Sequence, residues 1–505
     1  MRVLGDIARL NAKRFGDETA LIFEEQALSF SELNACGDGI GRRLLEMGVR
    51  IGDRVALLAE NCLEFFPIYF GIMKIGAVMV PLNYRCTVAE LEHMLRDSTP
   101  CVLFHTCALA TQAHALYGRI DAGFRLVEIS RALLDTQAPP VDELPADFDE
   151  RATATIMYTS GTTGTPKGAM LPHRALLEGT AATALAARIQ QSDRVVVTVP
   201  LFHGGGMYVV SHPHLYVGAS IVLTARFEPD ELFDLIERRG VTTFFGVPAQ
   251  YAALLDRRAQ TDARTSLRSA WYGGAPMSTE LTRRVQALWP GVQFQQCYGQ
   301  TETTLISVLG HQDHDRKMHT VGRELPHLEV RVVDEQGDDC PTGVIGEIVV
   351  NKNAGMTGYF NNPVQTTETI RDGWIHTGDL GFIDGDRFLT LVDRKKDMII
   401  SGGENVYPKE IEEAIFEREG VVEVAVVGAQ DAKWGEVPVG FVVVGKGSGI
   451  TASELQSWCE ERLARYKVPR QWRFVDELPR TANGKVRKTA LRDLLRESVT
   501  TTPTS

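Results

Sequence analysis

Short apolar runs alternate with helical patterns along most of this chain. Between residues 51 and 245, the runs with the length of buried strands are "DRVALLAEN", "GAVMVPLN", "PCVLFHT", "RVVVTVP", "ASIVLTA" and "VTTFFGVP". Apolar positions at helical spacing separate many of them, as in "EPDELFDLIERRG" at 228–240. This alternation predicts an α/β fold with largely buried sheets.

The longest apolar stretch, "FFPIYFGIMKIGAVMVPL" at 65–82, is interrupted by Pro67 and Lys74. It therefore predicts a buried helix followed by a buried strand, and not a membrane span. The N-terminal "MRVLGDIARLNAKRF" contains Asp6 and Arg9 among its apolar positions, which predicts an amphipathic helix and not a signal peptide. We expect a cytoplasmic protein without a transmembrane segment.

The pattern changes near residue 328. "LEVRVVDEQGDD", "GEIVVN" and "RFLTLVDRKKDMII" predict β-hairpins, and the chain after "DRKKD" predicts a compact α+β unit. We place a hinge at 394–397. It separates a large N-terminal domain of stacked sheets and helices (1–393) from a small, mobile C-terminal domain (398–505).

Composition narrows the classes of partner. The chain of 505 residues has a formal net charge of −12 and so no basic footprint for nucleic acid. Its eight cysteines are scattered, with no Cys-x-x-Cys pair, which predicts buried reduced thiols and neither a disulfide framework nor a zinc site. Any self-association is expected to give a homodimer.

The segment "YTSGTTGTPKG" at 158–168 is rich in anion-binding groups. It follows a predicted strand, "ATATIM", and precedes a predicted helix that begins near "PHRALLEG". Backbone N–H groups of a glycine turn, the hydroxyls of Thr162, Thr163 and Thr165, and the charge of Lys167 could all contact phosphate, with help from a nearby helix N-terminus. A proline precedes the lysine, so the segment does not fit the common P-loop spacing. Taken alone, it is a phosphate cradle or an exposed loop.

Four further motifs follow in order: "QCYGQTE" at 296–302, "HTGDL" at 376–380, "DRKKDMIISGGENVYPKEIE" at 393–412 and "PRTANGKVRK" at 479–488. Together with "YTSGTTGTPKG", they resemble the adenylate-forming superfamily over nearly the whole chain. That superfamily includes acyl-CoA synthetases, luciferases and the adenylation domains of peptide synthetases. The resemblance implies that ATP and Mg²⁺ convert a carboxylate to an acyl-adenylate, and that coenzyme A then displaces AMP.

The resemblance also implies a nucleotide site. In it, Thr162, Thr163 and Lys167 contact the β- and γ-phosphates, while Tyr298 lies against the adenine. The residues expected at this site are Thr159, Ser160, Gly161, Thr162, Thr163, Gly164, Lys167, Gly273, Gly274, Ala275, Tyr298, Gly299, Thr301, Asp379, Arg394 and Lys485. Of these, Thr301 is expected at the α-phosphate, and Asp379 and Arg394 at the ribose.

Catalytic roles follow from the same resemblance. Glu302, with Thr162, is expected to contact Mg²⁺, a hard cation that suits one carboxylate plus phosphate oxygens. Lys485 is expected to bridge the acyl carboxylate and the α-phosphate. Its neighbour Lys488 is interpreted as a solvated helix charge. His203 in "PLFHGGGM" matches a gate at the mouth of the acyl pocket.

The remaining positions concern the acyl group, coenzyme A and domain movement. Lys396 matches a hinge between two conformations that serve the two half-reactions. The residues expected to contact the acyl group or coenzyme A are His203, Gly204, Gly205, Gln250, Gly402, Gly403 and Trp434.

The distribution of charged residues indicates what kind of carboxylic acid the enzyme activates. From His203 to Ala225 the sequence contains no lysine, arginine, aspartate or glutamate, so a second charge on the acid would be unpaired there. We expect an uncharged tail, most simply a medium- or long-chain fatty acid, with an aryl or arylpropenoic acid as the alternative. Gln250 and Tyr251 are candidates for polar contacts, and His212 and His214 for contact with a phenol.

Functions of other classes stay open at this point. The chain could load an acyl group onto a carrier protein, or it could be an inactive nucleotide-binding relative. The intact loop motif with Glu302, Asp379 and Lys485 argues against the inactive alternative.

Overall fold

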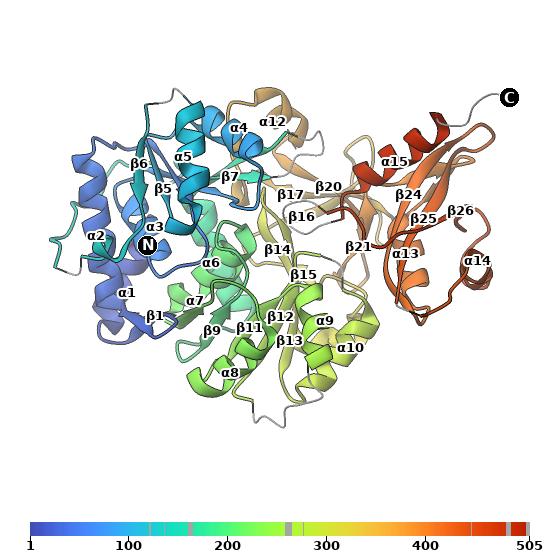
Figure 1. The fold of residues 1–505 in the computed structure, drawn as a ribbon, viewed down its shortest axis with the longest axis horizontal. Coiled ribbons are helices and arrows are strands. Elements are labelled where there is room, and N and C mark those ends of the chain that lie inside the picture. The colour runs from blue at the N-terminus through green and yellow to red at the C-terminus, as the bar shows by residue number, and fades with distance from the viewer. Residues whose placement is uncertain are drawn as a thin grey trace. The chain divides into compact units, whose positions relative to one another are not determined.

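The computed structural model describes residues 1–120, 123–135, 137–159, 165–257, 265–275, 277–445, 447–480 and 486–500, with backbone alone for 497–500. The chain divides into two compact units (Figure 1). The first contains Met1–Val330 and Val349–His376, and the second contains Arg331–Ile348 and Thr377–Ser505. The α/β fold predicted for the large domain and the α+β fold predicted for the small one are confirmed. The hinge at 394–397 stays a prediction.

The first unit contains a nine-stranded sheet. Its strands, in spatial order, are β15 (Arg323–Glu324), β14 (Thr304–Leu309), β13 (Gln293–Gln300), β12 (Ser269–Gly273), β11 (Thr243–Gly246), β9 (Arg194–Val197), β10 (Ser220–Leu223), β1 (Thr19–Phe23) and β2 (Gln26–Ser29). Helices α8 (Pro229–Arg239), α9 (Pro248–Arg257) and α10 (Thr279–Leu288) pack on β11–β13 (Figure 1). Strands β9 to β13 are parallel to one another, as βα alternation requires.

A seven-stranded sheet forms a second layer of the same unit. Its strands are β18 (Gly358–Tyr359), β8 (Lys167–Pro172), β7 (Thr153–Thr159), β4 (Val78–Leu82), β3 (Arg54–Leu58), β5 (Val102–His105) and β6 (Arg125–Glu128). Helices α4 (Val88–Ser98) and α5 (Ala110–Arg119) cover one face of it. The other α-helices that the structure describes in this unit are α1 (Asp6–Phe15), α2 (Phe30–Glu46), α3 (Phe65–Lys74), α6 (His173–Ala186), α7 (His212–Val217), α11 (His314–Lys317) and α12 (Pro363–Thr369).

The stretch at 65–82 forms a buried helix and strand, as predicted. Every residue of α3 and β4 is buried. Lys74 tolerates this burial because its ammonium group pairs with Asp38 at 2.8 Å and donates to Asn34 Oδ1 at 2.8 Å. In the described part of the chain, no helix has the length and apolarity needed to cross a membrane.

A five-stranded sheet contains β16 (Val330–Val333), β17 (Gly346–Asn351), β20 (Trp374–Ile383), β19 (Ile370–Arg371) and β21 (Leu389–Arg394). The hairpin predicted for "RFLTLVDRKKDMII" is wrong. Its first half, β21, pairs with β20, whereas its second half, β22 (Ile399–Ser401), pairs with β23 (Glu404–Val406) in another sheet. The polar turn at 395–397 therefore connects two sheets and does not close a hairpin.

The second unit is built on that other sheet, in which β22 and β23 are joined by β25 (Gly435–Val444), β24 (Val421–Asp431) and β26 (Gln471–Phe474). Helices α13 (Pro408–Phe416) and α14 (Ala452–Glu460) pack on one set of its apolar side chains. Helix α15 (Lys488–Thr500) packs on the alternate set, through Leu491 and Leu495. Side chains that alternate along β24 and β25 point to opposite faces of this sheet, and the helices bury both faces.

All eight cysteines are free thiols, as predicted from their scatter. The predicted burial is correct for Cys36, Cys297 and Cys459, but Cys107 is exposed. Burial raises the pKa of Cys297 to about 12, so that thiol stays protonated.

Candidate active site

The glycine-rich segment is framed by an antiparallel strand pair. Thr159, at the end of β7, lies opposite Lys167, at the start of β8, and its hydroxyl donates to the Lys167 carbonyl at 3.5 Å. Sequence reasoning missed β8. Because this strand is six residues long, α6 begins about 20 Å beyond Lys167, and the predicted help from a helix N-terminus is wrong. Ser160, Gly161, Thr162, Thr163 and Gly164 lie outside the described residues.

Lys167 and Glu302 are brought together by Tyr359, a residue that sequence reasoning missed. The Lys167 ammonium group lies 5.0 Å from the centre of the Tyr359 ring and donates to Gln365 Oε1 at 2.6 Å. The Tyr359 hydroxyl donates to Glu302 Oε1 at 2.7 Å. The candidate phosphate lysine and the candidate metal carboxylate therefore flank one phenol ring.

The other candidates of the first unit follow the carboxyl ends of neighbouring parallel strands. His203 comes after β9, Gln250 after β11, Gly273–Ala275 at the end of β12, and Tyr298–Glu302 at the end of β13. Small molecules bind outside the carboxyl ends of strands in open α/β sheets, because loops from adjacent strands converge there. The fold therefore assembles at one sheet edge four segments that lie far apart in the sequence.

The turn between β13 and β14 presents Thr301 and Glu302, which are half-buried. Tyr298 is 8% exposed within β13. Gly273 has a packing reason to be glycine, since a Cβ there would overlap the Cys297 carbonyl of the adjacent strand. Gly274 and Ala275 are exposed beyond the strand end.

Asn61 holds the loop that carries His203 through hydrogen bonds to its backbone. This buried amide donates to the Val199 carbonyl at 3.1 Å and accepts from the Leu201 N–H at 2.9 Å. His203 is half-buried and directly precedes Gly204 and the π-helix η3 (Gly205–Ser211). Single π-turns are frequent at functional sites.

Three side chains that were candidates for substrate contact lie in the core. His212 and His214 are fully buried, His212 between the rings of Tyr69 and Tyr208 at 5.0 and 4.8 Å. Tyr251 is also fully buried, and its hydroxyl donates to the Trp271 carbonyl at 2.9 Å. Each side chain lies on the inward-facing side of its helix. A sequence run without charged residues has no polar face, so it does not indicate which side of the helix faces inward.

Gln250 is half-buried at the start of α9. Its Oε1 accepts from the Val247 N–H at 3.1 Å, and its Nε2 donates to Thr198 Oγ1 at 3.1 Å. The side chain thus links the loops after β9 and β11.

In the second unit, Asp379 and Arg394 form a direct ion pair. They lie opposite each other on β20 and β21, with 2.6 Å between Arg394 Nε and Asp379 Oδ1. Asp379 is 6% exposed, so it is not the carboxylate of a solvated turn. Lys395 pairs in the same way with the buried Glu347 at 3.0 Å. Lys396 is exposed in the turn at 395–397, and its hinge role stays a prediction.

Gly402 and Trp434 lie against each other. The Gly402 N–H donates to the Trp434 carbonyl at 2.7 Å, and a Cβ on Gly402 would lie 2.7 Å from the indole ring. Two cations flank that ring: the Lys433 ammonium group lies 4.9 Å and the Arg470 guanidinium 4.8 Å from its centre. Gly403, like Gly402, has a left-handed backbone with a positive φ.

Lys485 lies outside the described residues. Its neighbour Lys488 is not the solvated helix charge that was expected, because its ammonium group pairs with Glu412 at 2.8 Å and is largely buried. Burial alone would lower the pKa of Lys488, but Glu412 and Asp393 raise it overall. Arg492 on α15 pairs with Asp397 at 2.7 Å.

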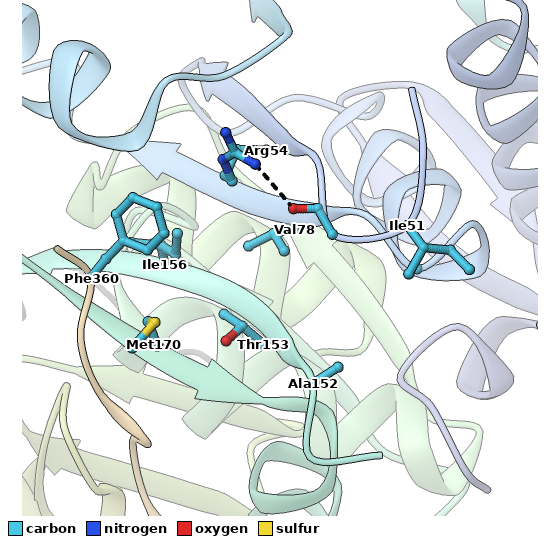
Figure 2. Close-up of a pocket in the computed structure, with 10 residues that line it drawn as sticks. Ile51, Arg54, Val78, Ala152, Thr153, Ile156, Met170 and Phe360 are labelled. Atoms are coloured by element: carbon cyan, nitrogen blue, oxygen red, sulfur yellow. Dashed lines mark hydrogen bonds between the residues drawn. The ribbon is translucent and has the colours of Figure 1, made fainter. Parts of the chain in front are cut away.

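An apolar recess of about 250 Å³ lies at one end of the seven-stranded sheet (Figure 2). Val78, Ile156, Met170 and Phe360 line it, together with Arg54. The Arg54 guanidinium is committed to backbone carbonyls, among them those of Ser98 at 2.9 Å and Gly52 at 3.3 Å. Among the described residues, none of the predicted site residues lines this recess.

Comparison with known proteins supplies the family. Residues 8–360 match the model "AMP-binding enzyme", and residues 410–485 match "AMP-binding enzyme C-terminal domain". The chain is 39% identical over 476 residues to a feruloyl-CoA synthase of Amycolatopsis sp, which covers 94% of this chain and 95% of that protein. It is 38% identical over 495 residues to an indoleacetate–CoA ligase of Aromatoleum aromaticum, with 95% of each covered.

A solved structure agrees with these matches. The o-succinylbenzoate CoA synthetase of Bacillus subtilis, in complex with its acyl-adenylate intermediate, superposes with a TM-score of 0.87 and 31% identity, covering 99% of this chain and 98% of that one. The chain therefore belongs to the AMP-binding enzyme family and is an AMP-forming acyl-CoA synthetase that uses ATP, Mg²⁺ and coenzyme A.

Proposed function

We propose that the enzyme activates an aromatic carboxylic acid, of the arylpropenoic or arylacetic kind. The observation that carries this proposal is the pair of relatives at 39% and 38% identity over nearly the whole chain, named for feruloyl and indoleacetate substrates. The residues agree with an uncharged ring. Gly204, Gly205 and Val209 are half-buried after the gate position, and the run that contains them carries no charge.

The residues around Glu302 fit a magnesium ion. The Tyr359 hydroxyl donates a hydrogen bond to one oxygen of the Glu302 carboxylate, and none of the described residues binds the other oxygen. Mg²⁺ commonly takes one or two carboxylates and completes its shell with water and phosphate oxygens, so one free oxygen in a half-buried turn suits it. When bound, the ion would offset phosphate charge. Lys167 would add a fixed positive charge at the mouth of the loop.

A panel of acids tests the substrate proposal. Pyrophosphate release would be measured with ATP and coenzyme A for ferulate, indoleacetate, decanoate, palmitate and malonate. We expect kcat/KM for an aromatic acid to exceed that for either fatty acid by at least about tenfold, or about 1.4 kcal/mol. A preference for decanoate or palmitate would overturn the aromatic assignment. Product formation with a carrier protein in place of coenzyme A would contradict the assignment of the acceptor.

Asp379→Asn is expected to raise KM for ATP about tenfold while the KM for the acid changes little. The amide keeps the shape of the side chain but removes the charge that pairs with Arg394 at 2.6 Å and that would accept from ribose hydroxyls. Steady-state kinetics with each substrate varied in turn checks this. Asp372→Asn, an exposed change in the β19–β20 turn, is the matched control. An unchanged KM for ATP would remove Asp379 from the nucleotide site.

Gly402→Ala is expected to slow thioester formation at least about fivefold more than ATP–pyrophosphate exchange. The left-handed φ of +63° disfavours alanine, and the added methyl would displace the Trp434 ring from 2.7 Å. Gly447→Ala is the control, because φ is +81° there and nothing lies within 4 Å of the added methyl. Equal slowing of both half-reactions in Gly402→Ala would contradict a role for this pair at coenzyme A.

A further inference from the structure

The segment from Gly355 to Phe360 is fastened to two parts of the candidate site at once. On one side, the Phe360 N–H donates to the Gly168 carbonyl at 2.8 Å, and the Thr357 N–H donates to the Met170 carbonyl at 2.9 Å. On the other side, the Met356 N–H donates to the Glu302 carbonyl at 2.7 Å. This segment, which contains β18, therefore ties the strand that begins at Lys167 to the turn that carries Glu302.

Successive residues of this segment have separate tasks. Side chains alternate along an extended strand. Phe360 lines the apolar recess (Figure 2), whereas Tyr359 reaches Lys167 and Glu302. Tyr359 is 6% exposed, and its own N–H donates to Thr366 Oγ1 at 2.8 Å. The phenol is thus fixed by its strand and by burial before any ligand binds.

The phenol is a suitable permanent donor to a carboxylate. A tyrosine hydroxyl ordinarily keeps its proton up to about pH 10, so at neutral pH it can donate to Glu302 Oε1 across 2.7 Å. A hydrogen bond to an ionised acceptor is about twice as strong as one between neutral groups. Glu302 lies in a short turn, where a carboxylate without such a bond would sample several rotamers.

The ring face has a second partner. The Lys167 ammonium group, 5.0 Å from the ring centre, is within the range at which a cation is attracted to an aromatic face. Gln365 Oε1 accepts from the same ammonium group at 2.6 Å. Ring and amide together define the position of the lysine at the end of the glycine-rich loop.

We infer that Tyr359 is a positioning residue for the adenylation step. Its hydroxyl orients the Glu302 carboxylate toward the metal, and its ring aligns Lys167 with the phosphates. The inference rests on the proposed metal role of Glu302. Residues that hold a metal ligand by hydrogen bonds commonly change metal affinity by 10–100-fold when they are replaced.

Tyr359→Phe tests the hydroxyl alone. ATP–pyrophosphate exchange would be measured against free Mg²⁺, with the acid that gives the highest rate in the panel above. We expect the half-saturating Mg²⁺ concentration to rise about tenfold, while kcat at saturating Mg²⁺ stays within about threefold of the natural enzyme. Tyr359→Leu also removes the ring, and KM for ATP should then rise a further two- to fivefold or so. Tyr117→Phe, at an exposed ring, is the control and should match the natural enzyme.

A binding measurement separates positioning from a general loss of structure. Mn²⁺ would be titrated by electron paramagnetic resonance in the presence of α,β-methylene-ATP, and Tyr359→Phe should bind it about tenfold more weakly. In a Glu302→Gln background the same change should weaken Mn²⁺ binding less than about twofold, because its effect passes through the carboxylate. Additive effects, or equal Mn²⁺ affinities for the natural protein and Tyr359→Phe, would overturn the inference. If the natural protein showed no exchange with any acid, the substrate proposal would fail, and the Mn²⁺ titration would decide the role of Tyr359.

Discussion

Lys485→Ala is expected to lower ATP–pyrophosphate exchange by roughly 10²–10³-fold. The family resemblance implies that this lysine bridges the acyl carboxylate and the α-phosphate, and negative charge from both groups would converge there as the adenylate forms. Removing one preorganised group at such a centre has an effect of this size. Thioester formation from preformed acyl-AMP should stay within about threefold of the natural rate, because that step no longer joins a carboxylate to a phosphate.

The two half-reactions provide the internal control for this prediction. Stopped assays would follow radiolabelled pyrophosphate exchange in one case and AMP release from synthetic acyl-AMP and coenzyme A in the other. Arg487→Ala changes an exposed cation two residues away and should leave both rates near those of the natural enzyme. Equal loss of both half-reactions in Lys485→Ala would contradict the assignment of Lys485 to the adenylation step.

Strands with regular apolar runs could be predicted from the sequence, whereas strands defined by their partners could not. "VMVPL" and "VTTFFG" carry their own burial signal and became β4 and β11. Strand β8 contains Gly168 and Pro172 and is a strand because β7 and β18 pair with it. The second half of "RFLTLVDRKKDMII" likewise joined a sheet whose other strands come later in the sequence.

The candidate site shows the same division. Residues in recognisable motifs, such as Lys167, Glu302 and Asp379, could be proposed from the sequence. Tyr359 could not be, because its hydrogen bond joins residues 57 positions apart and no local pattern marks a phenol that faces a carboxylate. The prediction that Lys488 is a solvated charge failed for a related reason. Its burial depends on an ion pair with Glu412, which lies far from the helix at 488–500 in the sequence.

Acidification from pH 7 to pH 5 is expected to destabilise the first unit strongly, because burial lowers the pKa values of several of its histidines, most strongly those of His173, His212 and His214. Burial lowers the pKa of His212 to about 3 and the pKa values of His173 and His214 to about 4. The unfolded chain titrates near the ordinary value of about 6.5. Between these values the unfolded state binds more protons than the folded state, so the free energy of unfolding falls as the pH falls.

The expected size follows from proton linkage. For one histidine that stays neutral in the folded state, the loss between pH 7 and pH 5 is about 2 kcal/mol. Three such residues together approach the 5–15 kcal/mol or so that stabilises a typical folded protein. Urea unfolding followed by tryptophan fluorescence at the two pH values would measure this, since the ring centre of the buried Trp271 lies 5.5 Å from that of His214.

His212→Phe isolates one of the three contributions. The ring packs between Tyr69 and Tyr208, and neither of its nitrogens has a hydrogen-bond partner among the described residues, so phenylalanine retains the contacts without removing a bond. The variant should lose about 2 kcal/mol less than the natural protein between pH 7 and pH 5. His319→Gln, at an exposed histidine, should keep the natural pH dependence. An identical pH dependence in His212→Phe and the natural protein would show that His212 takes up no proton on unfolding, and hence that its burial does not depress its affinity for protons.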